Sequence, residues 1–150
     1  MSLRDRFASA FGRVPESPAA PAAQRVDVGR HERDAQVVAT YLPPGTRGQV
    51  EEGIEYWIFD IKCELGNPYS MAAYFDGREY QVKVLHPDVT GKYSVHDGHL
   101  FSDGRICLNP PANGAASLQD AYAKAVVWAS GFSVMRHTGQ FPFSLNNQGG

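Results

Sequence analysis

Two cysteines are the strongest nucleophiles in the sequence, and their surroundings differ. Cys107 lies in the run Gly-Arg-Ile-Cys-Leu, after an Asp-Gly turn and before Asn-Pro-Pro, so we expect loop backbone to present its thiol. The thiolate is the nucleophilic form, and an unperturbed cysteine holds little of it at neutral pH. Cys63 instead alternates with apolar residues in a strand-like run, which indicates an inert packing thiol.

Cationic and imidazole groups near Cys107 are candidates for activating it. Arg105 stands two residues before the cysteine, His99 eight before and His96 eleven before, while His137 lies at the end of a predicted helix. A single cysteine with scattered histidines is a weak signal. On spacing alone, catalytic and purely structural roles for Cys107 both stay open.

Two other kinds of site are less well supported. A zinc site would need Cys107 with His86, His96 and His99, but structural zinc sites usually have paired ligands on both sides, and only His96 and His99 form such a pair. A cysteine hydrolase using Cys107 and a histidine usually needs a longer chain to form a substrate cleft. We therefore expect no metal site.

The folded part is expected to begin near Val28 with a helix that stops at Pro-Pro-Gly. In the run GRHERDAQVVATYL the apolar residues have helical spacing: Val37, Val38, Tyr41 and Leu42. The next run, EYWIFDIKCEL, predicts a strand with one buried face, because every second residue is apolar. These residues are Trp57, Phe59, Ile61, Cys63 and Leu65.

A hairpin and a turn-rich loop follow. The run SMAAYFDGREYQVKVL has two strand-like parts around Asp76-Gly77, a strong hairpin signal, with Tyr80, Val82 and Val84 on one face. His86-Pro87-Asp88 reads as the turn that ends the second strand. The run SVHDGHLFSDGRICLNPP is too rich in turns for regular structure and predicts an ordered functional loop.

A long helix completes the predicted fold. Ser117 is a good N-cap, Asp120 completes a capping-box-like pair, Gly139 is a plausible stop, and Pro142 prevents continuation. Its core-facing stripe is Leu118, Tyr122, Ala125, Val126, Ala129 and Phe132. The predicted class is α+β, with an N-terminal helix, an antiparallel meander sheet, an active-site loop and a long C-terminal helix.

Length and composition support one soluble domain over residues 28–143. The chain has 150 residues, 43% hydrophobic, and a net charge of -2, which gives no reason to expect nucleic acid. No apolar run approaches the roughly 20 residues of a membrane helix, and the start lacks the apolar core of a secretory signal. The sequence has only two cysteines and no other sign of a secreted, disulfide-stabilised scaffold. We therefore expect free thiols and a cytoplasmic location.

The N-terminal part, residues 1–27, has two sections. Leu3, Phe7 and Phe11 follow one another at steps of four, which predicts a short amphipathic helix, and a Pro/Ala-rich linker follows. This helix could dock on a partner or on this domain, or the segment could be a frayed tail. Residues 144–150 are expected to form a flexible tail.

The segment His99–Leu108 resembles the active-site segment of ubiquitin-conjugating enzymes. That family reads His-Pro-Asn, a short turn, and then Gly-x-Ile-Cys-Leu. Matching the cysteines aligns Gly104, Ile106, Cys107 and Leu108. The family's Asn then falls on His99, which is the main departure. An imidazole can also donate a hydrogen bond to an oxyanion, act as a general base or only brace the loop, so the role of His99 stays open.

The resemblance extends on both sides of this segment. The order of helix and meander over about residues 28–108 matches the family. Trp128 and the ending Arg136–Pro142, which contains Thr-Gly-x-aromatic-Pro, resemble the divergent bacterial branch. Gly149-Gly150 is similar to the tail of ubiquitin-like modifiers, which would make this chain a conjugation or peptidase substrate; a floppy polar tail is the simpler reading.

The resemblance implies a carrier mechanism centred on Cys107. The thiol would accept a ubiquitin-like modifier from an activating enzyme as a thioester and pass it to an amine on a protein target. No cofactor is implied, because the energy is supplied upstream. Such bacterial domains occur in antiphage operons, either with a dedicated modifier or with cyclic-oligonucleotide synthases as targets. A non-catalytic binding module of the same fold is the alternative, although such relatives generally lack the cysteine.

Overall fold

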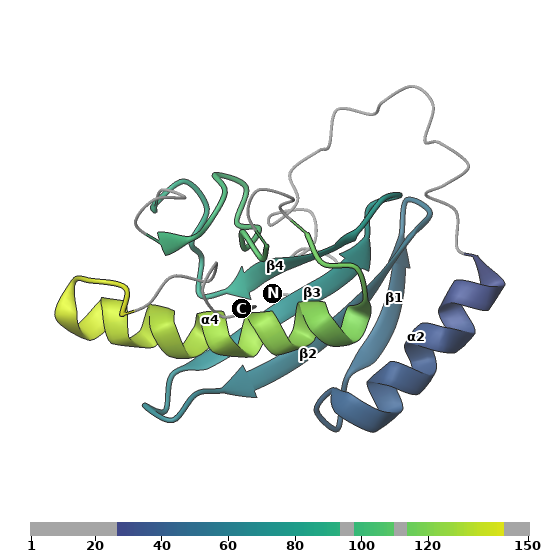
Figure 1. The fold of residues 1–150 in the computed structure, drawn as a ribbon, viewed down its shortest axis with the longest axis horizontal. Helices are drawn as coiled ribbons and strands as arrows, with labels where there is room; N and C mark the ends of the chain where they lie inside the picture. The colour runs from purple at the N-terminus through teal and green to yellow at the C-terminus, as the bar shows by residue number, and fades with distance from the viewer. Residues whose placement is uncertain (1–26, 94–97, 110–113, 143–150) are drawn as a thin grey trace.

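A computed structural model describes residues 27–93, 98–109 and 114–142 (Figure 1). Its elements are α2 (Val28–Tyr41), β1 (Arg47–Glu51), β2 (Ile54–Lys62), β3 (Pro68–Phe75), β4 (Tyr80–His86) and α4 (Leu118–Thr138). The expected α+β class is confirmed. The predicted helix of residues 1–13, the linker after it and the tail with Gly149-Gly150 lie outside the described residues.

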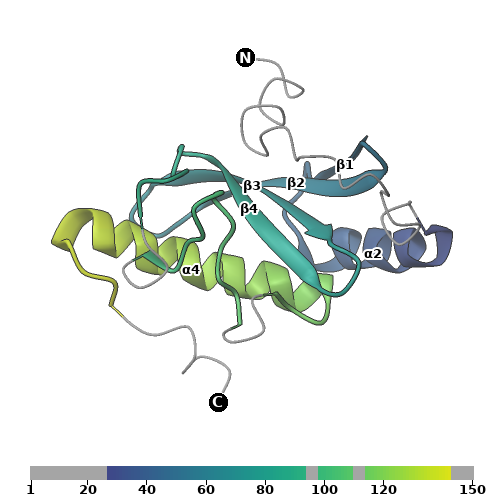
Figure 2. The same ribbon diagram turned by 90° about the horizontal axis from the view of Figure 1, so that it is seen from above.

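The sheet is an antiparallel meander in the order β1-β2-β3-β4, so β1 and β4 are its edge strands. In Figure 2 both helices lie on the same side of this sheet. The hairpin predicted around Asp76-Gly77 is confirmed, with β3 and β4 on either side of it. The sequence pattern missed β1, because Val50 is the only large apolar residue in this strand, and its side chain is 53% exposed.

The main core lies between the sheet and the helices. Alternate residues of β2, β3 and β4 pack in one cluster with the buried face of α4. Trp128 of α4 is fully buried there, edge-on to Tyr69 and stacked on Phe132. The expected faces hold except at three positions: Leu65, Tyr41 and Val126 are exposed. Leu65 falls after the end of β2, where the alternation no longer follows the sheet.

The caps of α4 match the sequence prediction. Ser117 Oγ accepts a hydrogen bond from the Asp120 N–H at 3.1 Å, which satisfies one of the free donors at the helix start. At the other end Gly139 adopts a φ of 84°, and its N–H donates to the Met135 carbonyl at 2.7 Å. The helix therefore stops at the predicted glycine, and Phe141 follows two residues after this cap.

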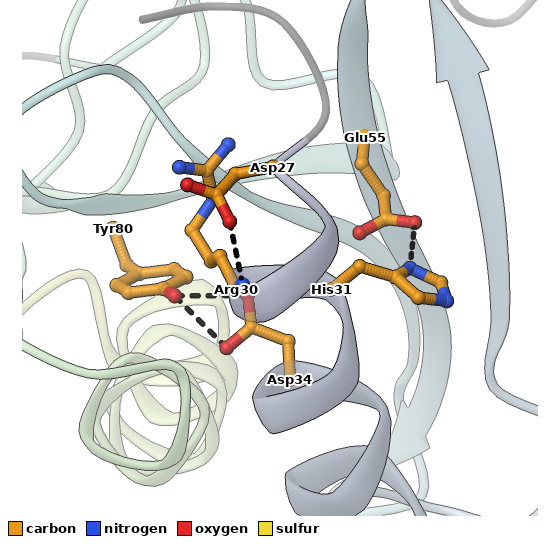
Figure 3. Close-up of polar contacts among 6 residues, drawn as sticks. All are labelled: Asp27, Arg30, His31, Asp34, Glu55 and Tyr80. Atoms are coloured by element: carbon orange, nitrogen blue, oxygen red, sulfur yellow. Dashed lines mark hydrogen bonds and ion pairs between the residues drawn. The ribbon is translucent and has the colours of Figure 1, made fainter.

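A buried carboxylate fixes α2 against the sheet (Figure 3). Tyr80 of β4 donates its hydroxyl to Asp34, lying 2.9 and 2.8 Å from the two carboxylate oxygens. Asp34 is 7% exposed, and burial raises its carboxyl pKa although the Tyr80 hydrogen bond opposes this shift. Near the start of the helix, His31 pairs with Glu55 at 2.6 Å and stacks on Trp57. The burial of Asp34 in α2 was not predicted from the sequence pattern, in which this residue lies off the apolar positions.

We expect Tyr80→Phe to lower the free energy of unfolding at pH 7 by about 1–3 kcal/mol, because it leaves a buried carboxylate without its donor. The same change raises the folded-state pKa of Asp34 further above its ordinary 3.8, so the loss of stability shrinks as the pH falls through that pKa. Urea denaturation over a pH series measures this. Tyr41→Phe, at an exposed position, is the control, and an equal effect of both variants would contradict the interpretation.

Candidate functional site

Residues 99–107 form a small hairpin, called the 99–107 hairpin below. The Cys107 N–H donates to the His99 carbonyl at 2.8 Å, and the Phe101 N–H donates to the Arg105 carbonyl at 2.8 Å. The tip closes with a bond from the Gly104 N–H to the Phe101 carbonyl at 2.9 Å. The backbones of His99 and Cys107 are therefore direct neighbours across this hairpin.

Side chains at the tip stabilise this turn. Asp103 accepts from the Arg105 N–H at 3.1 Å and from Arg105 Nε at 2.7 Å. The guanidinium of Arg105 also lies over the Phe101 ring, 4.7 Å from its centroid. Gly104 has a φ of 91°, which only glycine adopts without strain. The Asp-Gly pair noted in the sequence thus makes the tight turn that precedes Cys107.

The 99–107 hairpin is fixed to the free edge of β4. The Ile106 N–H donates to the Val82 carbonyl at 2.9 Å, and the Val84 N–H donates to the Gly104 carbonyl at 3.0 Å. From the other side, Trp128 Nε1 of α4 donates to the Gly98 carbonyl at 2.9 Å. The part of the predicted loop that the structure describes, residues 98–109, is therefore held by hydrogen bonds to the edge strand and to the long helix.

The Cys107 thiol is more deeply buried than the sequence suggests. Its neighbours Ile106 and Leu108 are fully buried in the core, and Cys107 itself is 3% exposed and free of any disulfide. Burial raises the pKa of the thiol, and the nearby Arg105 offsets this only in part. The expected presentation by loop backbone is thus corrected for this conformation. The hairpin carries Cys107, but the apolar anchors on both sides draw the thiol inward.

His99 connects the hairpin with the end of the chain's long helix. It has a φ of 54°, in the left-handed region, and its carbonyl accepts the Cys107 bond. The imidazole meets Phe141 edge-on, with ring centroids 4.6 Å apart. Phe141 is the aromatic residue of the Thr-Gly-x-aromatic-Pro ending. Two segments that the sequence analysis matched separately to one family are therefore in contact.

The remaining histidines do not join this site as a metal cluster. His86 ends β4, and His137 is exposed in the last turn of α4; His96 lies outside the described residues. Over residues 27–93, 98–109 and 114–142, no group of three or more His, Cys, Asp or Glu side chains is placed to hold a metal ion. The Cys107 N–H donates to the His99 carbonyl, and the charge of Arg105 lies close enough to act on the thiol.

Cys63 has the more activated environment of the two cysteines. Its Sγ lies 2.9 Å from Ser133 Oγ, which in turn lies 2.6 Å from the Tyr69 hydroxyl. Burial acts to raise the Cys63 pKa, but hydrogen bonds from Ser133 and from the backbone around Asn67 outweigh it, so the pKa is lowered. A groove of about 290 Å³ between β2 and α4 reaches this thiol. The sequence reading of Cys63 as an inert packing thiol missed this, because Ser133 is distant in the chain.

We expect alkylation to discriminate between the two thiols. Cys63, with its lowered pKa and partial exposure, should react faster with iodoacetamide at pH 7 than Cys107, whose pKa is raised and whose sulfur is covered. Mass spectrometry of Cys63→Ser and Cys107→Ser measures one thiol at a time. Ser133→Ala should slow the reaction of Cys63 and leave Cys107 unchanged. Faster labelling of Cys107 in the folded protein would contradict these assignments.

Comparisons with known proteins leave the site to be interpreted on its own geometry. None of the described helices has both the length and the apolar character needed to cross a bilayer. No protein-family model, curated protein or solved structure gives a significant match to this chain.

Proposed function

We propose that this protein is a ubiquitin-conjugating-enzyme-like carrier, in which Cys107 holds a ubiquitin-like modifier as a thioester. The observation that carries the proposal is the placement of Cys107 on an ordered hairpin between an edge strand and a long helix. The helix, meander, loop and helix occur in the order that the sequence resemblance implies. The contact between His99 and Phe141 supports it further, because it joins the two segments that carry the resemblance.

The chemistry consists of two acyl transfers. In the first, the Cys107 thiolate attacks the terminal carbonyl carbon of the modifier; the new C–S bond forms as the bond to the activating enzyme's sulfur breaks, and that sulfur leaves as thiolate. In the second, a neutral amine on the target attacks the same carbon. The C–N bond forms, the Cys107 thiolate leaves, and the amine gives up a proton to a base or to water. Neither transfer consumes a cofactor at this protein.

A donor near the carbonyl oxygen would speed the second transfer. His99 is the residue we propose for this role, since its carbonyl accepts the Cys107 N–H and its ring packs edge-on against Phe141. A hydrogen bond to the developing oxyanion stabilises the transition state more than the ground state. Packing against Phe141 restrains the ring, which reduces the entropy lost in placing that donor.

Burial of Cys107 places a condition on this function. A sulfur that is 3% exposed must become accessible before it can meet an activated modifier. Binding of the activating enzyme is the step that we propose exposes it, by shifting the hairpin or the residues around it. In the free protein the raised pKa keeps the thiol protonated, which protects it from unwanted electrophiles.

A non-catalytic protein-binding module of the same fold is the second candidate. The burial and raised pKa of Cys107 favour it, because both features suit a packing thiol. The two candidates differ in one observable, since only the carrier forms a covalent adduct with the modifier.

The biological setting that we propose follows from the same resemblance. It is a bacterial antiphage operon, in which the partners are a ubiquitin-like modifier, an activating enzyme and a protein target, and in which a cyclic-oligonucleotide synthase is the alternative target. Two unpaired thiols fit a reducing compartment such as the cytoplasm.

Incubation with modifier, activating enzyme and ATP should yield an adduct that a reducing agent cleaves. Cys107→Ser should give a reductant-resistant ester or no adduct, and Cys63→Ser should charge normally. With the activating enzyme well below saturation, the charging rate should rise with pH up to and beyond 9.0, the ordinary thiol value, because burial raises the pKa of the thiol in the free protein. Non-reducing gels measure the adduct. Loss of charging in Cys63→Ser, with Cys107→Ser unaffected, would move the site to the other thiol.

His99→Ala should charge normally but discharge to free amines about tenfold more slowly or worse, as loss of an oxyanion donor predicts. Single-turnover discharge of the purified thioester, followed on non-reducing gels, measures the rate. His137→Ala, which removes an exposed imidazole at the end of α4, is the matched control. Equal discharge by the wild type and His99→Ala would reduce His99 to a structural residue.

A further inference from the structure

Cys107 is buried without belonging to the main core. Its chain neighbours Ile106 and Leu108 both pack in that core and are 0% exposed. Successive side chains of an extended segment point to opposite sides, so the Cys107 side chain points away from the core that holds its neighbours. Among the described residues, the main core cluster accordingly does not include Cys107, although this residue is only 3% exposed. The sulfur therefore needs a cover on the other side of the hairpin.

The residue directly opposite Cys107 in the 99–107 hairpin is His99, whose carbonyl accepts the Cys107 N–H at 2.8 Å. Phe101 and Arg105 are the next such pair toward the tip. Opposed residues of an antiparallel pair have their side chains on the same side. The guanidinium of Arg105 over the Phe101 ring shows this for the hairpin. Cys107 lies on that same side, two residues after Arg105, with the backbone of His99 across from it.

Phe141 packs on His99 at this end of the hairpin. The two rings meet edge-on, with centroids 4.6 Å apart, and both residues are half-buried. Phe141 also packs against the main core, so it bridges the core and the hairpin. One ring contact and one backbone hydrogen bond therefore lead from Phe141 through His99 to Cys107.

The turn that follows α4 sets the position of Phe141. In Figure 1 the chain turns back after the last turn of this helix. Gly139 makes the reversal with a φ of 84°. The Thr138 hydroxyl lies 3.0 Å from the Val134 carbonyl oxygen and 3.1 Å from the Gln140 carbonyl oxygen, and it accepts the Gln140 N–H at 3.3 Å. One side chain thus ties the last turn of the helix to the residue that precedes Phe141.

We propose that Phe141 is a lid that keeps Cys107 covered in the free protein and that the activating enzyme displaces it. The lid itself rests on the contacts of Phe141 and His99 described above. Its displacement by the activating enzyme rests on the carrier function proposed in the preceding section. Gly139 and the Thr138 hydrogen bonds form the hinge on which the lid moves.

The hairpin is held more firmly than this lid. Trp128 is fully buried and donates its indole N–H to the Gly98 carbonyl at 2.9 Å, so breaking this bond would leave two buried groups without partners. A side chain at Gly98 would lie 2.9 Å from Tyr93 Cβ, which shows how closely the chain is packed there. The edge-on contact of a half-buried Phe141 with His99 is easier to break. Opening of the lid therefore exposes Cys107 at a lower cost than detachment of the hairpin.

This position of the lid predicts opposite effects of its removal on the two acyl transfers. Without the Phe141 ring the Cys107 thiol is more accessible, so charging becomes faster. The same ring restrains His99, the donor proposed for the second transfer, so discharge becomes slower. A residue that only stabilised the fold would not produce this pair of opposite changes.

Alkylation of a single thiol tests the lid without any partner. In a Cys63→Ser background, Phe141→Ala should raise the rate at which iodoacetamide labels Cys107 about tenfold, because labelling follows the population of the open state. Phe141→Tyr keeps the ring and should label like the parent. Thr138→Val, which loosens the hinge, should change the rate in the same direction as Phe141→Ala.

Phe75→Ala is the matched control for alkylation, since Phe75 is also a half-buried ring packed against the main core. It should label like the parent, and urea denaturation of each variant checks that labelling does not proceed through global unfolding. Unchanged labelling of Cys107 in Phe141→Ala would overturn the lid. An equal rise in Phe75→Ala would overturn it as well, because the effect would then belong to the core as a whole.

Charging and discharge separate the lid from the carrier function. With the activating enzyme well below saturation, Phe141→Ala should charge about threefold or more faster and discharge to free amines about threefold or more slowly. Slower charging by Phe141→Ala would overturn displacement by the activating enzyme. If no thioester forms in any variant, the carrier function fails, while faster alkylation of Phe141→Ala still supports the lid. If thioesters form but alkylation is unchanged, the lid fails and the carrier function stands.

Discussion

The backbone pairing between the 99–107 hairpin and β4 is the constraint on which the candidate site depends. β4 is an edge strand, and its unpaired N–H and C=O groups would otherwise be open to another chain. Gly104 and Ile106 satisfy part of that edge, and Ala115 satisfies the part next to Tyr80. One set of hydrogen bonds therefore protects the sheet and places Cys107. If the hairpin detached from β4, the edge of the sheet would be exposed and Cys107 would lose its position at the same time.

The two thiols show that the secondary-structure element carrying a cysteine does not determine the reactivity of its thiol. Cys63 follows a strand, where packing without reactivity is the usual expectation, yet hydrogen bonds from Ser133 and nearby backbone lower its pKa. Cys107 lies on a loop, where exposure is the usual expectation, yet its apolar neighbours bury it. In both cases the partners come from distant parts of the chain. The environment of a thiol, and not the element that carries it, sets its acidity.

The fold was more predictable from sequence than the site. Helix α4 with its Ser117 and Gly139 caps, the hairpin around Asp76-Gly77 and the turn before Cys107 all follow from local rules that the sequence displays. Strand β1 could not be predicted from such local rules, because its stability comes from pairing with β2 and not from its own residues. The burial of Asp34, in a helix with little apolar character, could not be predicted from the sequence either. Its burial makes sense only with Tyr80, which is distant in the chain.

The contact between Trp128 and Gly98 has an optical consequence. Trp128 is fully buried, stacks on Phe132 and donates its indole N–H to the backbone just before the hairpin. Indole emission depends on hydrogen bonding and on access of water to the ring, so any movement that frees Gly98 changes the fluorescence of this side chain. Trp57, the other indole, stacks on His31 of α2 and reports on a different region. The fluorescence of Trp128 should therefore report on movements of the segment that carries Cys107, because the two are joined by a hydrogen bond.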